Sequence, residues 1–250
     1  MADKSPHPFL SIIIPAYNEV QRLPAALEQA SAFLKQQDYS YEIIVVENGS
    51  SDRTLEVARA MVDHIPNLIV IHENIRGKGR AVKTGMLAAH GDYRFICDAD
   101  LSMPIEEIVR FLPPQLISIP VAIASREAAG AVRYDEPHYR HVVGRAFNWL
   151  VRLILLSGLN DTQCGFKCFT AEAAECIFPL VTISGWTFDV EALFIARRMD
   201  MEIREVGIPW YYNARSSVRV LRDAFQMGSD LLRIRWNAIT GKYHVKNQQH

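Results

Sequence analysis

The sequence contains no Cys-x-x-Cys pair, although it has four cysteines among its 250 residues. A small disulfide scaffold or a zinc ribbon shows dense or paired cysteines, so neither class fits this chain. Two of the four lie in apolar or aromatic surroundings, and we expect reduced thiols in a reducing compartment. The cysteines are Cys97, Cys164, Cys168 and Cys176.

Three further features are missing. The chain has no uninterrupted run of about 18 apolar residues, the length that a membrane-spanning helix needs. The first residues show no basic region followed by an apolar stretch, so we expect no signal peptide and a cytoplasmic protein. The 27 Lys and Arg residues nearly balance the 28 Asp and Glu residues, which leaves a net charge of −1 and no global field that favours nucleic acid.

What the chain does contain is an alternation of strand-like and helix-like segments. Apolar runs rich in β-branched residues are separated by segments whose apolar residues recur every three or four positions. This order predicts an α/β fold with a mostly parallel sheet, helices on both faces and right-handed crossovers. We expect strands at 9–14, 41–46, 68–71, 93–97, 121–124 and 203–208, and helices at 20–35, 55–65, 81–89, 104–112, 139–160 and 218–239.

Two carboxylates one residue apart follow the strand that begins at Tyr93. Asp98 and Asp100 come directly after this buried run, and residues i and i+2 point to the same side of an extended or turning segment. Both carboxylates could then face one Mg²⁺ or Mn²⁺ ion, with phosphate oxygens completing its shell. Taken alone, the pair favours a solvated turn, because Asp is common where strands end, and the metal site gains support only from the rest of the chain.

Polar side chains also follow three other strands, at 17–19, 47–48 and 74–78. The carboxyl ends of parallel strands meet at one edge of a sheet, so we expect these residues and the Asp98 pair to form one binding cleft. No Gly-x-Gly-x-x-Gly follows the first strand, and Gly77-Lys78-Gly79 lacks the spacing of a phosphate-binding loop. The cleft is therefore not a dinucleotide site.

The motifs in this order resemble those of the family-2 glycosyltransferases with the GT-A fold. They are Pro15-Ala16-Tyr17-Asn18-Glu19, the turn at 49–52, the segment 74–79 and Asp98-Ala99-Asp100. Segments 161–167, 186–191, 208–210 and 226–228 narrow the resemblance to the branch of dolichyl-phosphate glucosyltransferases, close to the mannosyltransferases. The resemblance covers residues 9 to 241. It implies a GT-A domain at 9–213, preceded by a disordered segment 1–8 and followed by a basic amphipathic helix and tail at 214–250.

The resemblance also implies the parts of a donor site. Asp98 and Asp100 would hold Mg²⁺ or Mn²⁺ together with the diphosphate, and Lys78 would assist at the donor. The expected contacts to the nucleotide-sugar are Pro15, Tyr17, Glu19, Glu47, Asn48, Lys78, Asp98 and Ala99. The chain departs from the family at Glu47-Asn48, where an Asp-Asp pair is usual, so the contact to the base is altered in length and charge.

We expect arginines to bind the phosphate of the acceptor, because the guanidinium fork matches phosphate oxygens. Arg126 and Arg140 lie beyond the donor edge and are the first candidates, with surface ion pairing as the alternative. The glucosyl branch has Gly-Ser-Lys where this chain has Arg215-Ser216-Ser217, so Arg215 or Arg219 is expected to replace the lysine.

Two segments carry apolar and basic residues together. The segment 139–160 contains three arginines and no acidic residue, and is predicted either to lie in a membrane interface or to be an ordinary core helix. The chain after position 214 has seven basic and two acidic residues, which suits an anionic lipid surface, although a solvated helix face is the alternative.

The resemblance thus implies an inverting glycosyltransferase that moves glucose from UDP-glucose onto a polyprenyl or dolichyl phosphate at the cytosolic membrane face. Mannosyl transfer from GDP-mannose is one alternative, and a non-catalytic nucleotide-sugar-binding module is another. Asp189 is a candidate catalytic residue, but a phosphate dianion is already nucleophilic and needs no general base. We therefore expect Asp189 to pair with an arginine or to cap the helix that it opens.

Overall fold

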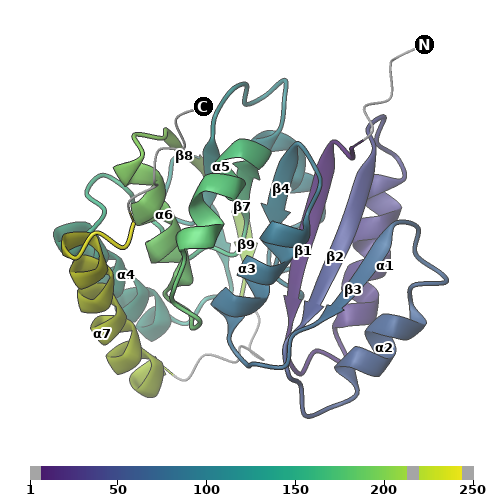
Figure 1. Ribbon diagram of the computed structural model, residues 1–250, viewed down its shortest axis with the longest axis horizontal. Coiled ribbons are helices and arrows are strands. Elements are labelled where there is room, and N and C mark those ends of the chain that lie inside the picture. Colours follow the sequence, from purple (N-terminus) through teal and green to yellow (C-terminus); the bar gives the residue numbers. More distant parts are fainter. Residues whose placement is uncertain (1–6, 213–219, 244–250) are drawn as a thin grey trace.

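The computed structural model describes residues 7–212 and 220–243, with the side chains of 220–225 excepted. The expected strands and helices are present (Figure 1). The strands are β1 (Leu10–Ala16), β2 (Tyr41–Glu47), β3 (Leu68–His72), β4 (Tyr93–Ile96), β5 (Val121–Ser125), β6 (Val132–Tyr134), β7 (Lys167–Thr170), β8 (Ile203–Gly207) and β9 (Pro209–Tyr211). The helices are α1 (Leu23–Leu34), α2 (Thr54–Ala60), α3 (Lys78–Ala88), η1 (Ile105–Phe111), α4 (His138–Ile154), α5 (Ala171–Ile177), η2 (Phe178–Leu180), α6 (Phe188–Arg198) and α7 (Val220–Ile239).

Seven strands form one sheet in the order β3-β2-β1-β4-β7-β5-β8. The pairs among β3, β2, β1 and β4 are parallel, as is the pair between β5 and β8. Strand β7 runs antiparallel between β4 and β5. The predicted α/β fold with a mostly parallel sheet is confirmed, and the carboxyl ends of β1 to β4 share one edge.

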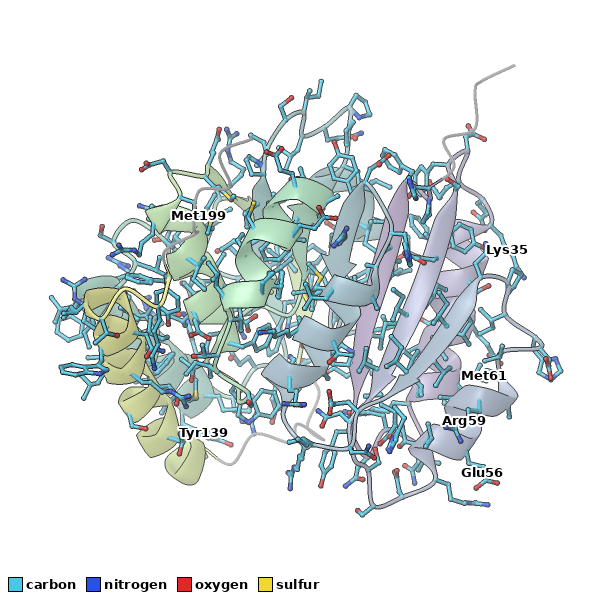
Figure 2. All side chains as sticks on the ribbon, in the orientation of Figure 1. Lys35, Glu56, Arg59, Met61, Tyr139 and Met199 are labelled. Carbon is cyan, nitrogen blue, oxygen red and sulfur yellow. The ribbon has the colours of Figure 1, made fainter. Side chains whose placement is uncertain are left out.

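Both faces of this sheet are covered. Alternate residues of one strand enter opposite cores, so Ile12 packs on the side of α1 and η1 whereas Ile13 packs on the side of α3 and α6. All three isoleucines at 12–14 are fully buried. Side chains fill the space between the sheet and its flanking helices (Figure 2). The uninterrupted apolar runs of the sequence are thus explained by burial on two sides.

Three elements that follow β5 were not predicted from the sequence, namely β6, β7 and α5. Strand β7 and helix α5 were not predicted, because β7 is only four residues long and too short to show a period. The segment 130–137, for which the sequence predicts no strand, contains β6, which pairs in parallel with β9. Tyr134 and Tyr211 stack across this small sheet with their ring centroids 4.5 Å apart. Each β6 residue pairs with one 77 positions further along the chain, out of reach of local sequence signals.

Helices α4 and α7 lie side by side at one end of the molecule (Figure 1). Of the residues of α4, only Asn148 and Val151 are buried, while Phe147, Leu150 and Ile154 pack against the core at partial exposure. One face of α4 thus belongs to the core, and the membrane-interface alternative stays a prediction for the other face. Helix α7 contributes Leu231 and Ile234 to the core and exposes Leu232 and Trp236. Within the part of the chain that the structure describes, no helix has the length and apolar character needed to cross a bilayer.

Candidate active site

A cavity of about 1300 Å³ opens at the carboxyl edge of the sheet. The ends of β1, β2 and β4 contribute to its wall, together with the start of α3 and residues of α4 and α6. Predicted donor residues that line it are Pro15, Tyr17, Glu19, Asn48, Lys78, Asp98, Ala99 and Asp100. The cleft predicted from the four strand ends is therefore formed.

Asp98 lies close enough to Asp100 to affect the pKa of the Asp100 carboxyl. Burial raises the pKa of Asp100, and the neighbouring Asp98 raises it further, although the backbone N–H of Ser102 donates to Asp100 Oδ1 at 3.0 Å and lowers it. Burial also raises the pKa of Glu19, with a smaller contribution from the two aspartates. Three carboxylates thus share one poorly solvated region of the cavity.

Lys78 supplies positive charge in this region. Its ammonium group lies 2.6 Å from Asp98 Oδ1 and 5.3 Å from the centre of the Trp186 ring. Burial by itself would lower the pKa of Lys78, but the carboxylates of Asp98 and Asp189 raise it above the ordinary value. Lys78 therefore stays charged, and a cation already occupies one side of Asp98.

The residues present fit a divalent metal ion that is shared with a ligand. The repulsion between Asp98 and Asp100 and the ammonium group on Asp98 mark a place where positive charge is stabilised. Carboxylate oxygens are the ligands that Mg²⁺ and Mn²⁺ prefer. In the described residues no group of three His, Cys, Asp or Glu side chains could hold a metal ion alone. Water or the oxygens of a ligand such as a diphosphate would complete the coordination shell.

The segment 161–167 contacts both sides of the cavity. A Cβ atom on Gly165 would lie 2.2 Å from Asp98 Oδ2, so only glycine leaves room for that carboxylate. Asp161 at the other end accepts hydrogen bonds from Arg126 Nε and Nη2 at 2.7 and 2.9 Å. Because β7 runs antiparallel, its beginning lies at the edge where the parallel strands end, and this brings the segment into the site.

Lys167 forms a buried ion pair with Asp189. Its ammonium group lies 3.1 Å from Asp189 Oδ1 and also donates to the carbonyl oxygen of Cys164. Burial raises the pKa of Asp189, while Lys167 and Lys78 oppose that rise. The prediction of an arginine partner for Asp189 is therefore wrong, and no side chain caps α6. Alternating charges run from Lys167 through Asp189 and Lys78 to Asp98.

Glu47 does not line the cavity, contrary to its predicted contact with the donor. Its side chain is buried, and it accepts from the Ser50 N–H and pairs with His72 Nδ1, each at 2.5 Å. Asn48 does line the cavity, and its Oδ1 accepts from the Gly77 N–H at 2.9 Å. Glu47 thus holds the 48–51 turn through Ser50 without lining the cavity, whereas Asn48 holds the loop before Lys78 through Gly77.

Two of the four predicted acceptor arginines, Arg126 and Arg140, line the same cavity. Two side-chain nitrogens of Arg126 donate to Asp161, whose side chain is 0% exposed. Arg140 faces the Tyr212 ring at 5.3 Å, and its buried Nε has no hydrogen-bond partner. Arg215 and Arg219 lie outside the described residues. Among the described residues, Arg140 forms no salt bridge.

Several relatives that share one name are similar to this chain over nearly its whole length. A "Dolichyl-phosphate beta-glucosyltransferase" from Drosophila melanogaster is 35% identical, with 99% of this chain and 80% of that protein covered. The human protein of the same name is 32% identical, with 97% and 79% covered. The model of glycosyl transferase family 2 matches residues 11–178. The chain belongs to glycosyl transferase family 2.

Solved structures show the same fold for this glycosyltransferase. Mannosyl-3-phosphoglycerate synthase from Rubrobacter xylanophilus has a TM-score of 0.69 at 15% identity, with 97% of this chain and 77% of that chain covered. Glucosyl-3-phosphoglycerate synthase from Mycobacterium tuberculosis, solved with Mn²⁺ and UDP-glucose, has a TM-score of 0.63 at 18% identity, with 92% and 78% covered. The GT-A resemblance is confirmed, and the protein is a nucleotide-sugar-dependent glycosyltransferase.

Sequence reasoning missed four residues of the glycosyltransferase cavity or its support. Gly165 and Lys167 lie in a segment that was singled out without a role. Trp186 faces Lys78, and Arg133 lies 5.9 Å from the centre of the Trp210 ring. Arg133 also forms ion pairs with Glu127 and Glu136. An aromatic residue next to an acidic motif was the available signal for Trp186.

Proposed function

We propose that this glycosyltransferase moves glucose from UDP-glucose to dolichyl phosphate or a related polyprenyl phosphate. The names of its relatives support the donor sugar and the acceptor. The observation that carries the proposal is Arg140, a cation on the cavity wall without an ionic partner among the described residues. A phosphate group entering the cavity would satisfy it.

The charges on the two sides of the cavity suit two different phosphates. On the donor side, Asp98 and Asp100 would hold Mg²⁺ or Mn²⁺, which would neutralise the diphosphate as it leaves. Lys78 stays charged beside Asp98 and would contact the same diphosphate. On the acceptor side, Arg140 and the remaining Nη1 of Arg126 would bind a phosphate monoester.

The transfer is a single displacement with inversion. An oxygen of the acceptor phosphate attacks carbon 1 of the sugar, and the bond from that carbon to the diphosphate oxygen breaks with its electron pair, releasing UDP. The acceptor phosphate is mostly a dianion near neutral pH, because its second pKa is about 6. No proton leaves the nucleophile, so Asp189, held by Lys167, has no proton to accept.

A panel of donors tests the proposal. Purified protein is incubated with UDP-glucose or GDP-mannose, with Mn²⁺ and with polyprenyl phosphate, and the lipid product is measured. We expect glucosyl transfer from UDP-glucose. Product from GDP-mannose alone would identify a mannosyltransferase, and binding of the donor without product under any condition would support a non-catalytic module.

Arg140→Ala should raise the KM for the polyprenyl phosphate about 30-fold and leave the donor KM unchanged. One charge-assisted contact to phosphate is lost, which costs about 2 kcal/mol. Arg133→Ala is the matched control, because Arg133 lines the same cavity but is already paired with two glutamates. A rise in the donor KM instead would place Arg140 at the diphosphate.

We further propose that α4 and α7 contact an anionic membrane surface. Their exposed apolar side chains are Tyr139, Val142, Val143, Trp149, Leu153, Leu232, Trp236 and Ile239. Exposed arginines accompany them at positions 145, 152, 233 and 235. Apolar and basic side chains on neighbouring helices suit the interface of a bilayer, where the cavity next to α4 would meet the acceptor headgroup.

Trp236→Asp should reduce binding to vesicles that contain anionic lipid by at least about tenfold, because an apolar anchor becomes an anion. Sedimentation with vesicles measures the bound fraction, and binding of the unaltered protein should weaken with salt. Ile117→Asp is the matched control, since Ile117 is 66% exposed but lies in the turn after η1. Equal losses for the two variants would contradict the assigned surface.

A further inference from the structure

Glu191 is a fully buried carboxylate on α6 that forms no salt bridge within the described part of the chain. Four hydrogen bonds to the Glu191 carboxylate compensate for its loss of contact with water. Oε2 accepts from the backbone N–H groups of Thr182 and Ile183, both at 2.7 Å. Oε1 accepts from the Thr182 hydroxyl at 2.7 Å and from the Tyr243 hydroxyl at 2.6 Å. A buried carboxylate that gathers this many donors fixes the segments that supply them.

One of those segments is 182–185, which packs against the loop that carries Lys78. The Ser184 carbonyl accepts from the Gly79 N–H at 2.9 Å. A Cβ atom on Gly77 would lie 2.4 Å from the Ser184 oxygen, and one on Gly79 would lie 2.4 Å from the Ile183 oxygen. The backbone of 183–185 therefore touches the residues on both sides of Lys78, and Trp186 follows directly.

The other donor comes from the end of α7. Gly241 has a φ of +77°, a conformation that favours glycine and turns the chain back toward α6. Tyr243 then packs its ring against Phe194 at a centroid distance of 6.1 Å and donates its hydroxyl to Glu191. Asn237 of α7 donates to the Thr182 hydroxyl at 3.2 Å. The last turn of α7 is thus linked to 182–185.

From these contacts we infer that Glu191 and Tyr243 are positioning residues for Lys78 and Trp186, and so for the donor diphosphate. Neither residue lines the cavity. Glu191 holds the 182–185 backbone, this backbone holds Gly77 and Gly79, and the two glycines set the direction of the Lys78 ammonium toward Asp98. The inference rests on the proposed function, because it assigns Lys78 to the donor.

Tyr243→Phe removes one hydroxyl and keeps the ring. We expect the donor KM to rise about tenfold while the acceptor KM stays unchanged, since a small displacement of Lys78 weakens only the donor contacts. Glu191→Gln should raise the donor KM further, because its amide group would face N–H and O–H donors. A purely structural role would lower kcat with the folded fraction and move neither KM.

Tyr39→Phe is the matched control, because the Tyr39 hydroxyl is buried without a hydrogen-bond partner and lies outside this network. It should leave both KM values unchanged. An unchanged donor KM in Tyr243→Phe, or an equal rise in the acceptor KM, would overturn the inference. Lys78→Met separates the two hypotheses: if it leaves the donor KM unchanged, the donor assignment itself fails, and if it raises that KM while Tyr243→Phe does not, only the positioning role fails.

Discussion

Asp100→Ala should lower the turnover of glucosyl transfer by at least about 1000-fold, because the diphosphate would leave without a metal ion to balance its charge. Asp98→Ala should be severe as well, although Lys78 would remain beside the diphosphate. Asp100→Asn is the sharper variant. Its amide oxygen can still accept from Ser102, so the turn is kept while the charge is lost. Transfer is measured over a range of Mn²⁺ concentrations.

Asp92→Ala is the matched control for this experiment. Asp92 immediately precedes β4, at the opposite end from Asp100, and is exposed. It should leave transfer unchanged. Titration of Mn²⁺ in the presence of UDP gives a second measurement, and the Asp100 variants should bind the ion more weakly. Turnover of Asp100→Ala at the wild-type rate in chelator-treated buffer would show that the metal assignment is wrong.

Arg126→Ala should lower the free energy of unfolding by about 3–5 kcal/mol, because it leaves the Asp161 carboxylate buried without its counter-charge. The Arg126 guanidinium holds the pKa of Asp161 well below its usual range, although burial alone would raise it. Arg204→Ala is the control, with an expected loss of at most about 1 kcal/mol, since Arg204 and its partner Glu202 are both about half exposed. Denaturant unfolding measures both variants.

The pH dependence of this difference has a definite sign. A depressed carboxylate pKa adds stability above the unfolded value of about 3.9, and that stability is lost as the pH falls toward the folded value. The Arg126→Ala variant can also relieve its penalty by protonating Asp161. The gap between the two proteins should therefore be largest near neutral pH and narrow in acid. Arg126→Ala with Asp161→Asn should recover most of the stability, and a gap that widens in acid would contradict the ion-pair explanation.

The sequence was sufficient for the donor half of the site because that half follows from periodicity and strand direction. Four apolar runs with polar ends predict one edge, and Asp98, Asp100 and Lys78 do meet there. Glu47 was misplaced, since a carboxylate at a strand end gives no local sign of whether it faces the cavity or His72.

The other half depends on contacts between distant segments. A lysine in a strand normally indicates an exposed face, but the Lys167 side chain is 1% exposed because Asp189 of α6 compensates its charge. The sequence does not show why position 165 requires glycine, because the reason is the close approach of the Asp98 carboxylate in the folded protein. Strand β6 forms only because β9 returns beside it. Such pairings are tertiary, and propensity cannot report them.

The antiparallel entry of β7 limits how chimeras with relatives can be built. Residues 161–167 contact three parts of the site. Asp161 accepts from Arg126, Gly165 packs against Asp98, and Lys167 pairs with Asp189 of α6. A chimera with its crossover point inside this segment would take some of these residues from one parent and their contact partners from the other. Exchange of 127–160 for the corresponding stretch of a relative, with Arg126 and 161–167 kept, would alter the acceptor side and leave the contacts of Asp161 and Gly165 within one parent.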